Sequence, residues 1–225
     1  MTSAVAQPAP ARDERLKITE VFLSLQGESS LAGWPTVFVR LTGCPLRCHY
    51  CDTTYSFHGG QWRSFDEILK EIGSLGARHV CVTGGEPLAQ KNVIELLRRL
   101  CDAGYVVSLE TSGAIDVSPV DARVIRIVDI KTPQSGEVHR NLWSNLDHLS
   151  AHDEIKFVLC SREDYDWSKR IVSEHALTSR CTVLFSPSHG QVGARELADW
   201  IVEDRLPVRF QTQLHKQLWG EEQGR

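Results

Sequence analysis

Short apolar runs alternate along this chain with longer segments in which apolar residues recur every three or four positions. The short runs are typical of buried strands, and the periodic segments are typical of amphipathic helices. The pattern predicts helices that begin near residues 64, 93, 162 and 195. It predicts strands at 18–25, 36–41, 79–83, 105–109, 124–130, 155–159, 182–185 and 208–211.

The first predicted helix has a clear start signal. Ser64 precedes an apolar stripe, and Glu67 follows three residues later, which is the spacing of a capping box. The turn between the first two strands contains Gly33 and Pro35. The stripe of this helix consists of Phe65, Ile68, Leu69 and Ile72.

Strands that alternate with helices predict right-handed βαβ units and a mainly parallel sheet. The body of the chain offers about six such strands, which is too few for an eight-fold barrel of about 250 residues. A partial barrel or a doubly wound sheet remains. In either fold, binding residues gather at the carboxyl ends of the strands.

Composition narrows the class of protein. The chain has 225 residues, 41% of them hydrophobic, and a net charge of −4. No apolar run reaches the roughly 18 residues of a membrane span, and the charge does not favour bulk binding to nucleic acid. Residues 1–14 are rich in alanine and proline and lack the features of a secretory signal. We therefore expect a disordered arm there and a cytoplasmic protein.

Three of the seven cysteines crowd into one loop directly after the second strand: Cys44, Cys48 and Cys51. Three thiolates in so short a loop are suited to an iron–sulfur cluster. A structural zinc site with His49 as fourth ligand is the alternative, but such sites commonly use two separate ligand pairs. The other four cysteines lie in apolar segments and are predicted to be buried, inert thiols: Cys81, Cys101, Cys160 and Cys181.

Polar residues also follow the later strands. Glycines at 84 and 85 come directly after the strand 79–83, and polar groups occupy 110–113, 129–133 and 186–189. Polar residues at successive strand ends indicate the wall of a binding site.

The C-x3-C-x2-C pattern, with Tyr50 before its third cysteine, resembles the signature of the radical S-adenosylmethionine (SAM) superfamily. The segment Thr83-Gly84-Gly85-Glu86-Pro87 is similar to that family's SAM-binding glycine motif. The resemblance implies a partial (β/α)6-type barrel with a parallel sheet. It also implies one 4Fe-4S cluster with an open iron that binds SAM.

A narrower resemblance, across about residues 16–219, is to the 7-carboxy-7-deazaguanine synthases. It rests on the segment 22–28, on Arg40 four residues before Cys44, on Cys51-Asp52-Thr53, and on Gln213-Leu214-His215-Lys216. These enzymes convert 6-carboxy-5,6,7,8-tetrahydropterin to 7-carboxy-7-deazaguanine with loss of ammonia, in queuosine and deazapurine biosynthesis.

The resemblance also implies residue roles. Cys44, Cys48 and Cys51 would bind the cluster, and Thr53 would bind Mg²⁺. SAM contacts would come from Tyr50, Cys51, Asp52, Gly85, Ser112, Lys131 and Ser186. Substrate contacts would come from Leu25, Gln26, Gly27, Glu28, Arg40, Thr83 and His215.

We expect one domain at 15–219 and a short acidic tail at 220–225, which differs from family members that end soon after the histidine segment. The resemblance further implies a flavodoxin-like reductant and a homodimer. Two other classes stay open: a small radical SAM activase that makes a glycyl radical on a partner protein, and a zinc-binding interaction module.

Overall fold

The computed structural model describes residues 14–220, 222 and 224, and these residues form one nine-stranded sheet. Five α-helices and several short 3-10 turns connect the strands. The helices are α1 (Phe65–Leu75), α2 (Val93–Asp102), α3 (Arg162–Glu174), α4 (Ala194–Asp204) and α5 (Leu214–Trp219). The strands are β1 (Arg15–Leu25), β2 (Pro35–Leu41), β3 (Gln61–Ser64), β4 (His79–Gly84), β5 (Val106–Thr111), β6 (Ile125–Asp129), β7 (Glu154–Leu159), β8 (Thr182–Pro187) and β9 (Arg209–Phe210).

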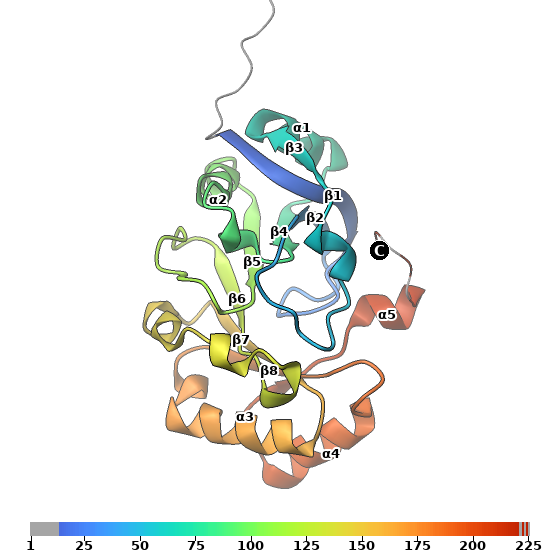
Figure 1. The fold of residues 1–225 in the computed structure, drawn as a ribbon, viewed down its shortest axis with the longest axis vertical. Coiled ribbons are helices and arrows are strands. Elements are labelled where there is room, and N and C mark those ends of the chain that lie inside the picture. Colours follow the sequence, from blue (N-terminus) through green and yellow to red (C-terminus); the bar gives the residue numbers. More distant parts are fainter. Residues whose placement is uncertain (1–13, 221, 223, 225) are drawn as a thin grey trace, which may run out of the picture.

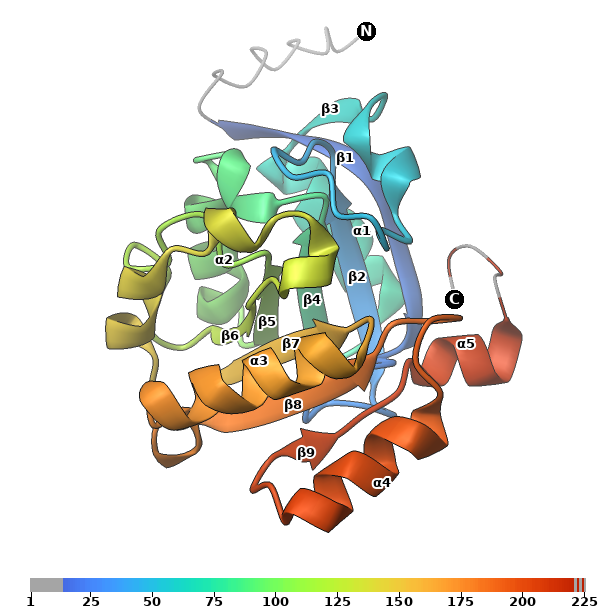
Figure 2. The same ribbon diagram turned by 60° about the horizontal axis from the view of Figure 1, so that its bottom comes forward.

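The sheet confirms the predicted α/β partial barrel. Its strand order is β3-β1-β2-β4-β5-β6-β7-β8-β9, and every pair from β2 to β9 is parallel. Only β1 runs antiparallel to its neighbours β2 and β3. The strands curve around a central space with the helices on the outside (Figure 1; Figure 2).

The predicted strands and the first four helices are all present, with ends that differ by a few residues. The predicted capping box is formed, since the side chains of Ser64 and Glu67 each accept a hydrogen bond from the other residue's backbone. Neither β3 nor α5 was predicted. β3 is a polar segment whose one large apolar side chain, Trp62, is 59% exposed, so it carries no hydrophobic pattern.

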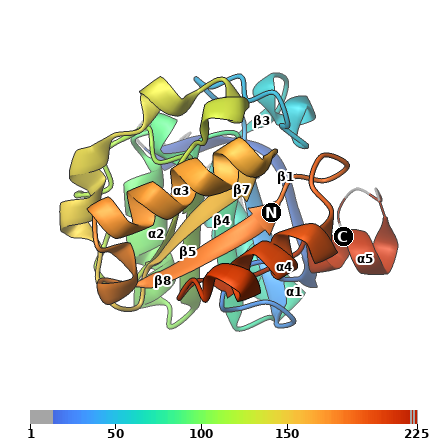
Figure 3. The ribbon, with the colours of Figure 1, turned by 90° about the horizontal axis from the view of Figure 1, so that it is seen from below.

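Two apolar cores support the sheet from outside. Around the first half of the chain, α1 packs against β1 and β3, and α2 packs against β5. Around the second half, α3 packs against β7, and α4 packs against β9 (Figure 3). Aromatic residues, among them Phe157, Tyr165 and Phe185, fill this second core. The inner face of the sheet is thereby left to line a cavity, with both polar and apolar side chains.

The open side of the barrel, between β1 and β9, is bridged by the loop at 26–34. The Ser29 amide donates to Gln211 Oε1 at 2.9 Å, and Arg209 Nη1 donates to Ser30 Oγ at 3.2 Å. Helix α5 then returns to this loop, where the Leu214 amide donates to the Gly27 carbonyl at 3.0 Å. The last helix therefore lies beside the end of β1 (Figure 1).

Some expectations concern residues outside this description. Apart from Glu14, the arm predicted at 1–14 lies outside the described residues, as do 221, 223 and 225 of the tail. Among the described residues, no helix has both the length and the apolar composition that crossing a membrane requires.

The cysteine burial prediction was only half right. Cys81 and Cys181 are buried, whereas Cys101 and Cys160 are only partly buried. Cys101 lies in the last turn of α2, and Cys160 is the first residue after β7, where the sheet no longer covers it.

Candidate functional site

A cavity of about 540 Å³ is lined by residues at and after the carboxyl ends of the strands. All seventeen residues assigned a role by sequence line it. They are Leu25, Gln26, Gly27, Glu28, Arg40, Cys44, Cys48, Tyr50, Cys51, Asp52, Thr53, Thr83, Gly85, Ser112, Lys131, Ser186 and His215. They come from both ends of the chain and from strands between, so one cavity unites motifs that are far apart in sequence.

The cysteine loop and the glycine turn after β4 are packed directly on each other. The Gly85 amide donates to the Leu41 carbonyl at 3.1 Å, and the Glu86 amide donates to the Gly43 carbonyl at 2.8 Å. A Cβ atom at Gly85 would lie 2.2 Å from the Gly43 oxygen and 2.9 Å from Cβ of Cys44. Only glycine allows this approach, so the two motifs form one structural unit.

The three loop cysteines fit an iron–sulfur cluster better than a single metal ion. Each is half-exposed to the cavity. Among the described residues, no three His, Cys, Asp or Glu side chains converge on a point that would hold one ion. A four-iron cluster does not require convergence, because each cysteine binds a different iron. His49 packs against Gly136 instead, which speaks against its role as a fourth zinc ligand.

Burial disfavours the thiolate form of two of the loop cysteines. It raises the pKa of Cys44, and it raises the pKa of Cys48 to about 11, against the opposing charge of Lys131. Thiolates at neutral pH would therefore require the positive charge of bound iron. Thr53 lies beside this group, with its hydroxyl oxygen 3.8 Å from the Cys51 sulfur.

The side of the cavity predicted to hold SAM carries polar atoms that the described residues do not satisfy. Lys131 Nζ lies 2.9 Å from Asp129 Oδ2 and 5.7 Å from the centre of the Tyr50 ring. Asp129 Oδ1 and the Tyr50 hydroxyl are both buried, and neither has a hydrogen-bond partner among the described residues. Buried polar atoms are nearly always paired, so these two fit a polar cofactor such as SAM.

Glu86, the acidic residue of the glycine turn, organises the neighbouring strand end. It is fully buried and accepts hydrogen bonds from the Leu88 amide at 2.9 Å and the Ser112 amide at 2.7 Å. The hydroxyls of Thr111 and Ser112 also donate to it. Ser112 is thus fixed in place at the cavity by Glu86.

The cavity wall next to Asp129 also contains a buried ion pair. Lys156 Nζ lies 2.8 Å from Glu28 Oε2 and 3.8 Å from Asp129 Oδ2. Burial alone would lower the pKa of Lys156, but Glu28 and Asp129 outweigh it and raise that pKa overall. Burial would likewise raise the pKa of Glu28, but Lys156 outweighs it and lowers that pKa. Both groups are therefore charged at neutral pH.

The C-terminal helix segment brings further polar groups to this side. Gln213 Nε2 donates to Glu28 Oε1 and to Asp52 Oδ2, both at 3.0 Å. Burial would raise the pKa of Asp52, but this hydrogen bond and Lys216 lower it overall. The His215 ring packs on Gly27, where a Cβ atom would lie 2.2 Å from its Nδ1. The first and last sequence motifs therefore meet at one wall.

Arg40 faces the cavity with part of its guanidinium already engaged. Its Nε donates to Glu20 Oε1 at 2.7 Å, across the β1–β2 pair, and Tyr55 donates to the same oxygen at 2.8 Å. Nearby, the Thr83 hydroxyl donates to Glu110 Oε2 at 3.0 Å. Glu110 also accepts from Gln26 Nε2 at 3.4 Å.

The sequence assigned no individual role to four residues of the cavity: Lys156, Gln213, Asp129 and Glu110. The last three do lie in segments that the sequence marked as a family motif or as site wall. Lys156 carried a usable signal. It is a charged residue in the middle of a strand that otherwise reads as buried and apolar, where lysine is rarely found without a partner. Gln213 was part of the C-terminal motif, but its contact with Glu28 could not be foreseen, because it depends on the return of α5 to the loop after β1.

Comparison with known proteins agrees with this geometry. Residues 38–131 match the Radical SAM superfamily. A 7-carboxy-7-deazaguanine synthase from Chlorobaculum tepidum is 46% identical over 209 residues, covering 91% of this chain and 94% of that protein. Another from Koribacter versatilis is 43% identical, covering 92% and 98%.

A solved structure shows the same fold. The crystal structure of QueE from Escherichia coli superimposes with a TM-score of 0.75 at 24% identity, and the match covers 89% of this chain and 95% of that one. The curated relatives match over nearly their full length, and one cavity unites the motifs that resemble theirs. This chain therefore belongs to the family of 7-carboxy-7-deazaguanine synthases within the radical SAM superfamily.

Proposed function

We propose that this chain converts 6-carboxy-5,6,7,8-tetrahydropterin to 7-carboxy-7-deazaguanine with loss of ammonia, as a radical SAM enzyme of queuosine and deazapurine biosynthesis. The observation that carries the proposal is the near full-length identity to synthases of that name. One cavity lined by every predicted site residue supports it. Residues 15–219 would act as one domain, because the site draws on both ends of that range.

The residues divide into two groups by position. Cys44, Cys48 and Cys51 would hold the cluster, which together with SAM would supply a 5′-deoxyadenosyl radical that abstracts hydrogen from the substrate. Tyr50, Lys131 and the glycine turn would hold SAM beside the cluster, together with Asp52, Ser112 and Ser186.

The substrate would lie toward β1 and α5. Arg40 would face its carboxylate, since a guanidinium is suited to such a group, although Glu20 already engages its Nε. Thr83, His215 and the segment 25–28 would enclose the ring. These residues and those that hold SAM would together exclude water from the radical.

Thr53 would bind Mg²⁺ through its hydroxyl, with the substrate carboxylate and waters as further ligands. Hard oxygen ligands of this kind are those that magnesium prefers. In a magnesium titration of turnover, Thr53→Ala should require a higher concentration than the parent while binding SAM equally well. Coincident titration curves would remove Thr53 from the metal site.

The decisive experiment is anaerobic turnover. The reconstituted chain is incubated with carboxytetrahydropterin, SAM and a reductant, and the product is measured beside 5′-deoxyadenosine. We expect 7-carboxy-7-deazaguanine and ammonia in equal amounts. If the protein cleaves SAM but makes no 7-carboxy-7-deazaguanine, the radical SAM assignment stands and the proposed reaction is wrong.

The two partner expectations, a flavodoxin-like reductant and a homodimer, remain part of the proposal. A flavodoxin and dithionite can be compared as electron donors in the same assay. The glycyl-radical activase is not favoured, because the curated relatives reported above are named as synthases. The zinc module is disfavoured by the lack of convergent ligands among the described residues.

A further inference from the structure

The ion pair between Glu28 and Lys156 lies at the surface of the cavity and not in the apolar core, so a ligand can reach both charged groups. Glu28 comes from the loop after β1, and Lys156 comes from the middle of β7 across the barrel. Both side chains line the cavity, with 14% and 12% of their surface exposed.

Both groups keep bonding capacity toward that space. Glu28 Oε1 accepts from Gln213 at 3.0 Å, and Oε2 accepts from Lys156 at 2.8 Å and from Gln211 at 3.4 Å. A carboxylate offers about four acceptor positions, two on each oxygen, so one is open on Oε1. The 3.4 Å contact from Gln211 to Oε2 is long, so a ligand N–H can take its place. An ammonium offers three donors. The Lys156 ammonium has one short contact, to Glu28, and one long contact of 3.8 Å, to Asp129.

The pair is also fixed in its charged form. Each partner's charge offsets the cost of burying the other, and the pKa of Lys156 is raised while that of Glu28 is lowered. Neither group is therefore poised to exchange a proton near neutral pH. Recognition of a ligand suits such a pair better than acid–base chemistry does.

The pattern that this pair presents is two adjacent acceptors followed by a donor. A 2-amino-4-oxopyrimidine ring presents the complement along one edge: the amino group and N3–H as donors, then O4 as acceptor. We propose that Glu28 and Lys156 together read this edge of the substrate, with Glu28 accepting from the amino group and N3–H and Lys156 donating to O4. This inference rests on the proposed function, because it takes the pterin as the ligand.

The surroundings favour this edge over the substrate carboxylate. Glu28, Asp129 and Glu110 all act electrostatically on Lys156, so its neighbourhood is acidic. A second carboxylate brought there would be repelled, whereas N–H donors would be attracted. The carboxylate of the substrate would accordingly point elsewhere, toward Arg40 or Thr53.

Two stable oxidised ligands test the idea by binding. 6-Carboxypterin carries the 2-amino group, and 6-carboxylumazine carries an oxygen there; both keep N3–H and O4. Each is titrated by fluorescence into the reconstituted protein with SAM bound. The parent should prefer the pterin by about tenfold or more, because a buried carboxylate facing an oxygen loses its partner.

The two variants should change binding in different ways. Glu28→Gln places an amide donor against the lumazine oxygen, so it should abolish or invert the preference. Lys156→Met removes the donor to O4, which both ligands share, so it should weaken both about tenfold or more and keep their ratio.

A matched control is Glu154→Gln. Glu154 is buried and accepts hydrogen bonds from the Ser30 amide of the same loop, but it does not line the cavity. This variant should keep the parent's preference. If Glu28→Gln loses the cluster or the fold, the neutral double variant Glu28→Gln with Lys156→Gln replaces it, and iron content and circular dichroism check its integrity.

The inference is wrong if the parent shows no preference, or if the Glu28 variant keeps it. Turnover of the tetrahydropterin is scored separately. A parent that binds the pterin selectively but forms no product contradicts the proposed function and leaves this recognition standing. A parent that forms product while the Glu28 variant discriminates as before contradicts the recognition alone.

Discussion

Strands β6 and β7 carry a buried ion pair at each end, and the two ends differ in how completely their charges are satisfied. Near the amino ends, Arg126 bonds to Asp153, with side chains 7% and 0% exposed. Nearer the carboxyl ends, Asp129 lies between Lys131 and Lys156 at the cavity. The register places Asp129 opposite Lys156 in adjacent strands.

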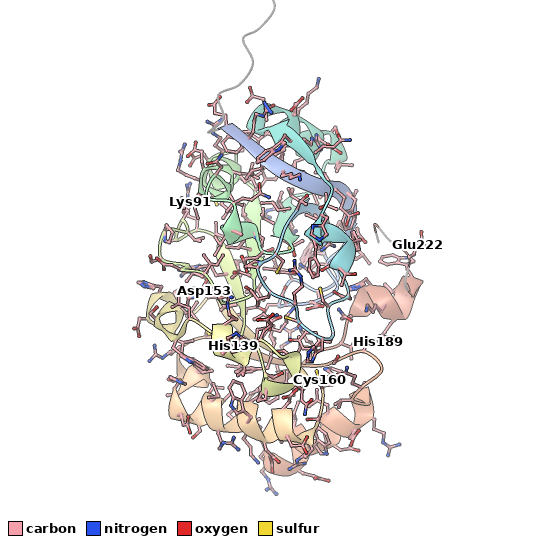
Figure 4. The ribbon with its side chains drawn as sticks, viewed as in Figure 1. Lys91, His139, Asp153, Cys160, His189 and Glu222 are labelled. Atoms are coloured by element: carbon pink, nitrogen blue, oxygen red, sulfur yellow. The ribbon has the colours of Figure 1, made fainter. Side chains whose placement is uncertain are left out.

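The Asp153 carboxylate has a full set of partners. It accepts from the backbone amide, Nε and Nη2 of Arg126, at 2.6–3.0 Å, and from the amide and hydroxyl of Ser150. By contrast, Asp129 Oδ1 is buried without a partner among the described residues. Figure 4 labels Asp153 among the side chains of the protein.

The contrast teaches that burial of a charge does not by itself mark a site. A buried pair whose hydrogen-bonding groups are all satisfied within the protein has a structural role. A buried pair with unsatisfied hydrogen-bonding groups at a cavity is a candidate for ligand binding. The predictions below test that distinction at both ends of the strands.

The largest effect is expected at the cavity end. Cys48→Ala should abolish the intact cluster and all turnover, because no other cysteine of the loop replaces the missing ligand. Iron and sulfide analysis after anaerobic reconstitution measures this, with Cys101→Ala on α2 as the control that keeps full loading. Full iron content in the Cys48 variant would contradict the assignment.

At the opposite end, Arg126→Met should lower the free energy of unfolding by about 3–5 kcal/mol, because it leaves the Asp153 charge buried and unpaired. Urea unfolding of the apoprotein measures the change. Lys156→Met should cost clearly less, since Glu28 keeps Gln213 and contact with the open cavity. Equal losses would show that the two pairs do not differ in kind.

Gly85→Ala should affect both stability and cluster loading. It should lower the free energy of unfolding by about 1–3 kcal/mol through overpacking, and it should reduce the iron content of the reconstituted protein. The added methyl would press on backbone of the cysteine loop. Gly193→Ala is a suitable control, because its Cβ would have ordinary contacts beyond 3.7 Å to Glu196 alone. Unchanged iron content in the Gly85 variant would show that the cysteine loop does not depend on the glycine turn for cluster binding.

The smallest effect concerns pH. Burial would raise the pKa of Asp153, but its bonds to Arg126 and Ser150 lower it overall. A carboxylate with a lowered folded pKa contributes stability above its unfolded value, near 3.9, and loses it as pH falls through the folded value. The stability gap between parent and Arg126→Met should therefore persist from about pH 7 to about pH 4 and shrink only as the pH falls below about 4. A constant gap would contradict this linkage.

The sequence pattern predicted the parallel sheet and four of the helices because apolar runs and capping signals are local. Ser64 and Glu67 define a helix start without reference to the rest of the chain. The same pattern missed β3, where Gln61 and Arg63 carry no apolar alternation, and α5, whose position depends on Gly27.

The candidate site was foreseen where motifs are contiguous. The cysteine loop and the glycine turn could be identified in sequence, and the structure places them in contact. What sequence alone did not supply is pairing across the barrel: Glu28 with Lys156, 128 residues apart, and Glu28 with Gln213, 185 residues apart. Sequence also did not reveal that Arg40 is already paired. The register of β1 and β2 places Glu20 opposite Arg40, and the two side chains form an ion pair.

The docking of α5 on the loop after β1 has a consequence for the order in which the protein becomes functional. The three loop cysteines, the glycine turn and Lys131 all lie in the first 131 residues, whereas Gln213 and His215 lie near the end of the chain. Because chains are synthesised from the amino end, the wall that Gln213 and His215 form against Glu28 and Gly27 is the last part of the cavity to be made. A chain that stops before residue 213 would therefore carry the cysteine loop and the glycine turn but would leave the cavity open on the side of β1.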